Sequence, residues 1–177
     1  MGAVVRASTD SARPGRTAAV AALAVVVLAL SSCGAETIPE RRRSTVTLEQ
    51  AKAQVDTYLA EILARLTVKP TASPADFLDS HCDANDVGPH GRMQTSRGYD
   101  FGDVPLASKT EAAAAFRTFL MGKGFEPDPS ATADWVKLKN PKDKFLAILD
   151  GVSGESHNLS LEVSTPCVWP KGTPPPS

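Results

Sequence analysis

The feature that most constrains this chain is an unbroken apolar run near its N-terminus. Residues 18–30 are thirteen apolar residues in succession, and Arg6, Arg13 and Arg16 precede them against a single Asp10. A helix of this length would reach roughly 20 Å, whereas the hydrocarbon core of a bilayer is about 30 Å thick. A basic head before a short apolar run is typical of a secretory signal. We therefore expect the folded part of the chain to follow this run.

The apolar run ends in small residues, where a signal peptidase would cleave. The segment Leu30-Ser31-Ser32-Cys33 resembles the lipobox of bacterial lipoproteins. This resemblance implies that residues 1–32 form a lipoprotein signal peptide and that the Cys33 thiol carries a diacylglyceryl group. Two or more acyl chains would hold the mature protein stably in a membrane. The alternative is an ordinary secretory signal that happens to end beside a cysteine.

The length and charge of the remaining chain suit one compact domain. Residues 1–33 hold three of the nineteen basic residues and one of the twenty acidic residues, so the part after Cys33 is slightly acidic. This balance offers no electrostatic footprint for nucleic acid. The run Arg41-Arg42-Arg43 lies close to the expected anchor. There it would either contact anionic headgroups or form part of a solvated tether.

The chain has three cysteines, an odd number for an exported protein. If Cys33 carries lipid, Cys82 and Cys167 remain, and they can pair in only one way. An oxidising compartment favours such a bond, and closing so long a loop would stabilise the fold by about 4–5 kcal/mol. We therefore expect a disulfide between Cys82 and Cys167.

Two long helices are expected from capping signals. Thr47 and Gln50 form a capping box, and apolar residues then recur every three or four positions as far as Leu66. Ser108 and Glu111 form a second capping box before an alanine-rich segment that ends at glycines. Both helices carry an apolar side that can pack on a sheet.

One short helix is also expected between the two long ones. Ser73 followed by Pro74 and Asp76 is a favourable helix start, because proline fits the first turn and an acid suits the positive helix end. This helix would deliver Cys82 to its partner.

Four strands are expected, which makes the fold α+β. Residues 92–101 carry charges on both sides, which suits an edge strand. Residues 135–139 and 159–164 alternate apolar and polar side chains, and residues 144–149 contain an apolar segment that suits a central strand.

The turns and the expected disulfide arrange these strands. Turn residues connect the last three strands into an antiparallel meander. The Cys82–Cys167 bond would bring the start of the first strand next to the end of the fourth. We therefore expect a four-stranded antiparallel sheet in the order 1-4-3-2, with the two main helices on one face.

Polar and proline-rich segments define the domain boundaries. Residues 33–46 are expected to form a lipid-anchored flexible stalk, and residues 170–177 a disordered proline-rich tail. Residues 47–169 then form a single extracytoplasmic domain.

Possible metal ligands gather at residues 81–90, which include His81, Cys82, Asp83 and His90. Their order matches neither a calcium-binding loop nor a zinc motif. We expect a polar turn stapled by its cysteine, without a metal or another cofactor.

Residues 151–154 loosely resemble a nucleophile elbow, but the second glycine comes one residue too early. Ser153, with His157 as its base, is the catalytic pair that could be considered. Neither residue has a recognisable catalytic setting, and we expect that the protein is not an enzyme.

A candidate recognition face lies on the strand expected at residues 135–139. Trp135, Lys137 and Lys139 share the solvent-facing side of this strand, and either Leu146 or Phe145 would lie beside them. The alternative is that Trp135 covers the edge of the sheet, since single exposed apolar side chains are common.

The layout as a whole is similar to that of small lipid-anchored proteins of actinobacteria. The similarity consists of the lipobox, the short stalk, the two-cysteine domain and the ending Pro166-Cys167-Val168-Trp169-Pro170 before a proline tail. It implies a position on the outer leaflet of the cytoplasmic membrane and carries over no catalytic residues. We expect a non-enzymatic module that binds an envelope protein or another envelope component. The alternative is a small-molecule or lipid carrier with a pocket between helices and sheet.

Overall fold

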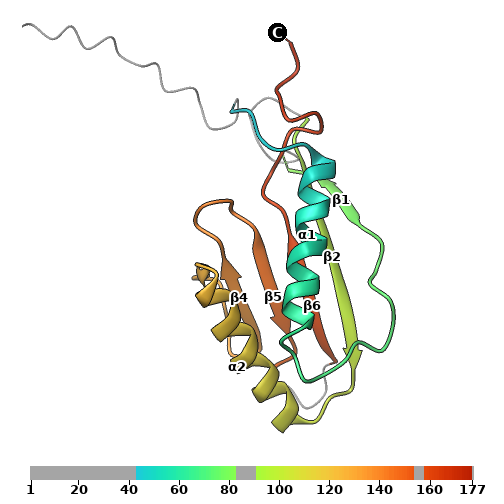
Figure 1. Ribbon diagram of the computed structural model, residues 1–177, viewed down its shortest axis with the longest axis vertical. Helices are drawn as coiled ribbons and strands as arrows, with labels where there is room; N and C mark the ends of the chain where they lie inside the picture. The colour runs from blue at the N-terminus through green and yellow to red at the C-terminus, as the bar shows by residue number, and fades with distance from the viewer. Residues whose placement is uncertain (1–42, 83–90, 154–157, 177) are drawn as a thin grey trace, which may run out of the picture. The chain divides into compact units, whose positions relative to one another are not determined.

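The structure is a computed structural model, and it describes residues 43–82, 91–153 and 158–176. These residues form an α+β fold with one antiparallel sheet, which confirms the expected class (Figure 1). The expected signal peptide, Cys33 and the greater part of the expected stalk lie outside the described residues.

The first helix, α1 (Leu48–Leu63), begins where the sequence predicts. The Thr47 hydroxyl accepts a hydrogen bond from the Gln50 amide, and the Gln50 side chain accepts one from the Thr47 amide. This confirms the capping box, which satisfies two amides at the helix start. The helix ends at Leu63, before the end of the apolar stripe, yet Leu66 still packs into the core.

The second helix, α2 (Leu106–Gly122), begins earlier than the sequence predicts. The expected capping box at Ser108 and Glu111 is wrong, because the N-cap is Pro105 and no side chain caps the helix. Alanine has the highest intrinsic helix propensity, so this alanine-rich segment forms a helix without a side-chain cap. The helix ends at a glycine, as expected.

The sheet has six strands in the order β1-β2-β6-β5-β4-β3, and all neighbouring strands are antiparallel. The strands are β1 (Leu78–His81), β2 (Met93–Gly102), β3 (Glu126–Pro127), β4 (Trp135–Lys139), β5 (Leu146–Asp150) and β6 (Leu159–Ser164). The prediction of a four-stranded sheet is therefore wrong. The four expected strands correspond to β2, β4, β5 and β6, which lie side by side as β2-β6-β5-β4. The sheet continues beyond them at both ends.

The two additional strands carry no alternating apolar pattern. Every residue of β1 is exposed, and β3 has only two residues, one of which is proline. Both strands join the sheet through backbone hydrogen bonds, which depend little on side-chain type. A search for apolar periodicity therefore misses them.

The strand expected at residues 92–101 does form, as β2, but the prediction that it is an edge strand is wrong. It lies between β1 and β6. Before β1, the Thr71 amide donates to the Asp100 carbonyl at 2.9 Å, and the Ala75 amide donates to the Gly98 carbonyl at 3.0 Å. The chain from residue 71 to residue 81 thus protects the edge of β2 from unwanted pairing.

The prediction of a short helix after Ser73 is also wrong, because this part of the chain pairs with β2 instead. Residues 73–77 contain no helix, and the chain then enters β1. Hydrogen bonding to the carbonyls of β2 competes with the local helix signal of Ser73, Pro74 and Asp76. The long-range pairing prevails over a helix start that only three residues favour.

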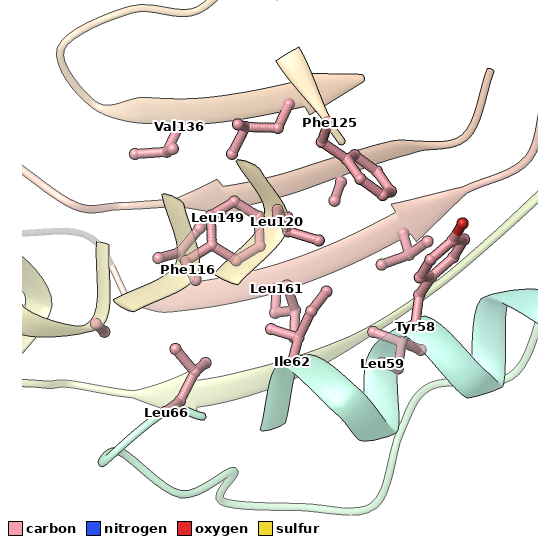
Figure 2. Close-up of a cluster of buried hydrophobic side chains, with 14 of the residues drawn as sticks. Tyr58, Leu59, Ile62, Leu66, Phe116, Leu120, Phe125, Val136, Leu149 and Leu161 are labelled. Atoms are coloured by element: carbon pink, nitrogen blue, oxygen red, sulfur yellow. The ribbon is translucent and has the colours of Figure 1, made fainter. Parts of the chain in front are cut away.

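Both helices cover the same face of the sheet, as predicted (Figure 1). Helix α1 packs over β2 and β6, whereas α2 packs over β4. Figure 2 shows the apolar side chains from both layers meeting in the core, among them Ile62, Phe116, Leu120, Leu149 and Leu161. The space between helices and sheet is thus occupied by buried side chains.

A close approach between β2 and β6 depends on Gly98. A Cβ atom at this position would overlap the carbonyl oxygen of Leu161. We expect Gly98→Ala to lower the free energy of unfolding by about 1–3 kcal/mol, because the two strands must shift apart. Urea unfolding measures the loss. Gly122→Ala is the matched control, because a Cβ there meets no atom within 4 Å; equal stability of the two variants would contradict the close approach.

Candidate functional site

The face of the sheet opposite the helices carries the candidate recognition residues. We call it the open face, because no helix lies on it in the part of the chain that the structure describes. Val136 and Leu138 of β4 point into the core, so the alternate residues of that strand belong to the open face. The open-face side chains of β4, β5 and β6 are Trp135, Lys137, Lys139, Leu146, Ile148, Asp150, Ser160 and Glu162.

Trp135 and Lys137 form a preordered pair on this face. The Trp135 side chain is exposed at 42 %, and the Lys137 Nζ atom lies 4.4 Å from the centroid of the Trp135 ring. This is a cation–π geometry, which limits the freedom of both side chains before any partner arrives. Lys137 Nζ also lies 3.4 Å from Ser130 Oγ.

The residue beside this pair is decided by the strand register. Lys137 lies opposite Ile148, and Lys139 lies opposite Leu146. Phe145 precedes β5 and is buried in the core. Of the two neighbours that the sequence leaves open, Leu146 is therefore the one on the open face.

Strand β4 is not left as a bare edge. The Asp128 amide donates to the Lys137 carbonyl at 3.0 Å, and the Thr132 amide donates to the Trp135 carbonyl at 3.2 Å. Together with β3, this segment pairs with the outer side of β4. The alternative in which Trp135 shields an uncovered edge therefore receives no support.

The other half of the open face is hollowed. A depression of about 380 Å³ lies over β2 and β6, and residues 72–78 form part of its wall. Ser96, Gly98 and Ser160 are among its lining residues, and they leave room because their side chains are small or absent. The open face thus combines an aromatic and cationic side with a small depression.

A larger groove lies at one end of the sheet. It has a volume of about 650 Å³ and is lined by residues 43–46, 143–146 and 165–168, together with Arg92, Gln94, Asp128 and Lys139. We call it the sheet-end groove. Lys139 belongs both to this groove and to the open face, so the two surfaces adjoin.

Trp169 joins the two ends of the described chain beside this groove. Its side chain is only 1 % exposed, and its indole N–H donates to the Arg43 carbonyl at 3.0 Å. Its amide donates to Thr45 Oγ at 2.8 Å, and the Thr45 amide donates to the Gly172 carbonyl at 2.8 Å. These contacts connect the last residues of the expected stalk with the first residues of the expected tail. Both belong to the hydrogen-bonded structure of the domain.

The disulfide between Cys82 and Cys167 is present, which confirms the pairing. It joins the chain after β1 to the chain after β6. Next to it, Met93 and Val168 exchange two backbone hydrogen bonds, each of 2.8 Å. The disulfide thus reinforces the end of the sheet at which the groove lies.

Two of the possible metal ligands are described. His81 is exposed on β1, and Cys82 is bonded to Cys167, so it has no free thiolate for a metal. Residues 83–90 lie outside the described residues. Among residues 43–82, 91–153 and 158–176, no group of three or more His, Cys, Asp or Glu residues could hold a metal ion.

Ser153 has a structural partner. Its amide and its hydroxyl both donate to Asp134 Oδ1, at 3.0 and 2.9 Å. These bonds tie the end of β5 to the chain before β4. His157 and Gly154 lie outside the described residues, so the pair of Ser153 and His157 is untested.

Tyr58 is a buried polar residue that the sequence patterns did not single out. Its hydroxyl donates to Asp143 at 2.7 Å, and its ring packs edge-on against Phe125 and Phe145. Burial, followed by the hydrogen bond to Asp143, raises the pKa of Tyr58 well above its usual value. The hydroxyl therefore stays neutral and connects α1 to the turn before β5.

Neither helix of the described segments combines the length and the apolarity that crossing a bilayer requires. No protein-family model matches the chain, and neither a curated protein nor a solved structure matches it. The functional argument therefore depends on the residues themselves.

Proposed function

We propose that this chain is an extracytoplasmic lipoprotein, anchored in the cell membrane through Cys33. In this proposal its domain binds an envelope protein or another envelope component and catalyses no reaction. The lipobox-like segment supports the anchor. The Cys82–Cys167 disulfide supports an extracytoplasmic location, because such bonds persist in oxidising compartments.

The observation that carries the binding proposal is the exposed Trp135 with Lys137 held against its ring on the open face. Tryptophan is enriched among the residues that dominate interface energies. A side chain that is ordered before binding loses less conformational entropy when a partner covers it. Ile148 and Leu146 extend this pair with apolar surface on the neighbouring strand.

The alternative of a carrier with a pocket between helices and sheet is less favoured. The side chains between the two layers are buried against one another, including Phe116, Leu120 and Leu161. The two hollows described above lie at the open face and at the end of the sheet. A ligand between the layers would have to displace the core.

The anchor is tested by metabolic labelling with palmitate. We expect the wild-type protein to carry the label and to sediment with membranes, and Cys33→Ala to lose the label. An unlabelled wild-type protein would contradict the anchor. This experiment does not depend on the binding face.

The binding face is tested by crosslinking the anchored protein in intact cells and quantifying the crosslinked partners by mass spectrometry. We expect the double variant Trp135→Ala/Lys137→Ala to reduce the amount of specifically crosslinked partner by about tenfold or more, because an aromatic anchor and its cation are removed. The matched control is Arg117→Ala/Met121→Ala, which removes an exposed cation and an exposed apolar side chain from α2. Partner recovery that falls equally in both variants would argue against the open face.

A further inference from the structure

We propose that the sheet-end groove binds the phosphate of an anionic phospholipid in the membrane that carries the protein. In this arrangement the basic side chains of the groove contact the phosphate, and its apolar floor contacts the adjoining part of the lipid. This inference rests on the proposed lipid anchor. It extends that proposal by assigning the domain its own contact with the bilayer.

The charge of the groove favours an anion. Four basic side chains line it, and two acidic ones. The basic residues are Arg43, Arg92, Lys139 and Lys144. Arg43, Lys139 and Lys144 are exposed, so a ligand reaches them without a rearrangement of the domain. The sequence adds Arg41 and Arg42 directly before the groove.

The two acidic residues of the groove are both engaged by donors of the domain itself. Asp128 Oδ1 accepts hydrogen bonds from the Ser130 hydroxyl at 2.6 Å and from the Ser130 amide at 2.9 Å. These bonds lower the pKa of Asp128. Asp143 accepts the Tyr58 hydroxyl through Oδ2 and the Phe145 amide through Oδ1. Both carboxylates keep their charge and are held by these donors, so the four basic side chains leave the groove with an excess of positive charge.

The groove also has an apolar part, which a free phosphate would not need. Val46 is 49 % exposed at its rim, and Leu146 and Pro166 are half-buried. Phe145 and Val168 are buried beneath them. Exposed cations and apolar side chains in one groove match the two ends of an amphiphile.

The position of the groove brings it close to a bilayer. Arg43 lies ten residues after Cys33, and ten residues span at most about 35 Å when fully extended. Trp169 holds Arg43 and Thr45 on the domain, so one wall of the groove is the very segment that leads to the anchor. This tether is short enough for the domain to reach the membrane surface, where anionic lipids attract basic groups within about 10 Å.

The test anchors the full-length wild-type protein in lipid vesicles and measures the rate at which each of its lysines is chemically acetylated. One vesicle preparation contains phosphatidylcholine alone, and the other contains one part phosphatidylglycerol to two parts phosphatidylcholine. We expect Lys139 and Lys144 to react about fivefold or more slowly in the anionic vesicles. Lys142 lies in the same turn but outside the groove, and Lys69 follows α1. Each of these two control lysines should therefore react at the same rate in both preparations. Equal slowing of Lys142 would show general contact with the surface and overturn the proposal, as would unchanged rates at Lys139 and Lys144.

Two further arms separate the sources of the effect. Soluble glycerol phosphate added to phosphatidylcholine vesicles should leave the rates unchanged; equal protection would overturn the assignment to a lipid. The variant Arg43→Gln/Lys144→Gln should lose the protection of Lys139, whereas Lys69→Gln/Lys142→Gln should keep it. Sedimentation of the protein with both kinds of vesicle reports the anchor separately. A failure of the anchor is therefore distinguishable from a failure of the groove.

Discussion

Trp169→Ala is expected to lower the free energy of unfolding by about 3–5 kcal/mol, which is the usual cost of truncating a fully buried large aromatic residue. The side chain is 1 % exposed, and its indole N–H donates to the Arg43 carbonyl. The substitution therefore leaves a cavity and removes one hydrogen bond. Urea unfolding followed by circular dichroism measures the loss without relying on tryptophan fluorescence.

The chain contains one matched control, because it has only two tryptophans. Trp135 is 42 % exposed, and Trp135→Ala should change the stability by about 0.5 kcal/mol or less. Trp169→Phe keeps most of the ring volume and removes the indole donor, so it should cost about 1 kcal/mol for the hydrogen bond alone, plus the loss of packing. Equal losses in Trp169→Ala and Trp135→Ala would contradict the buried position of Trp169.

Removing the disulfide with Cys82→Ala/Cys167→Ala is expected to lower the free energy of unfolding by about 4–5 kcal/mol in the chain-entropy model. The bond closes a loop with a sequence separation of 85, so its loss greatly enlarges the unfolded ensemble. Urea unfolding again measures the difference. A small domain that loses this much stability should show an unfolded fraction at 37 °C.

Reduction of the wild-type protein provides the control for the double variant. Dithiothreitol should lower the stability of the wild-type protein to about that of the variant, and it should leave the variant unchanged. Equal stability of the oxidised and reduced wild-type proteins would contradict a stabilising disulfide. A response of the variant to the reductant would reveal an effect unrelated to Cys82 and Cys167.

Both substitutions act on the same end of the domain. Cys167 and Trp169 lie two residues apart, and between them Val168 pairs with Met93 at the start of β2. Residues 167–169 thus connect to the chain after β1 through the disulfide, to β2 through Met93, and to residues 43–45 through Trp169. Cys167 and Val168 also line the sheet-end groove. We therefore expect these substitutions to disturb the groove more than they disturb the part of the open face around Trp135.

The elements that local patterns describe well were predictable. The Thr47–Gln50 capping box needs only residues three apart, and β4 alternates apolar and polar residues in its own sequence. The disulfide followed from the count of cysteines once Cys33 was assigned to lipid. Trp135 and Lys137 were recognised because they share one side of a strand, whatever strand lies next to it.

The elements that depend on distant partners were not predictable. Strand β1 is exposed throughout, and it is a strand because β2 offers it carbonyls and amides. The same long-range pairing cancels the helix signal at Ser73. The groove was missed because its basic residues come from three parts of the chain that are far apart in sequence and form no motif.

By itself the sequence determined the α+β class, the cysteine pair and the solvent-facing side of β4. These features depend on composition or on residues a few positions apart, and local periodicity reports them directly. Only the tertiary structure decided the six strands, the pairing of further chain with the outer sides of β2 and β4, the burial of Trp169 and the assembly of the groove. Each of these depends on backbone hydrogen bonds or packing between residues far apart in the chain, which no short window of sequence contains.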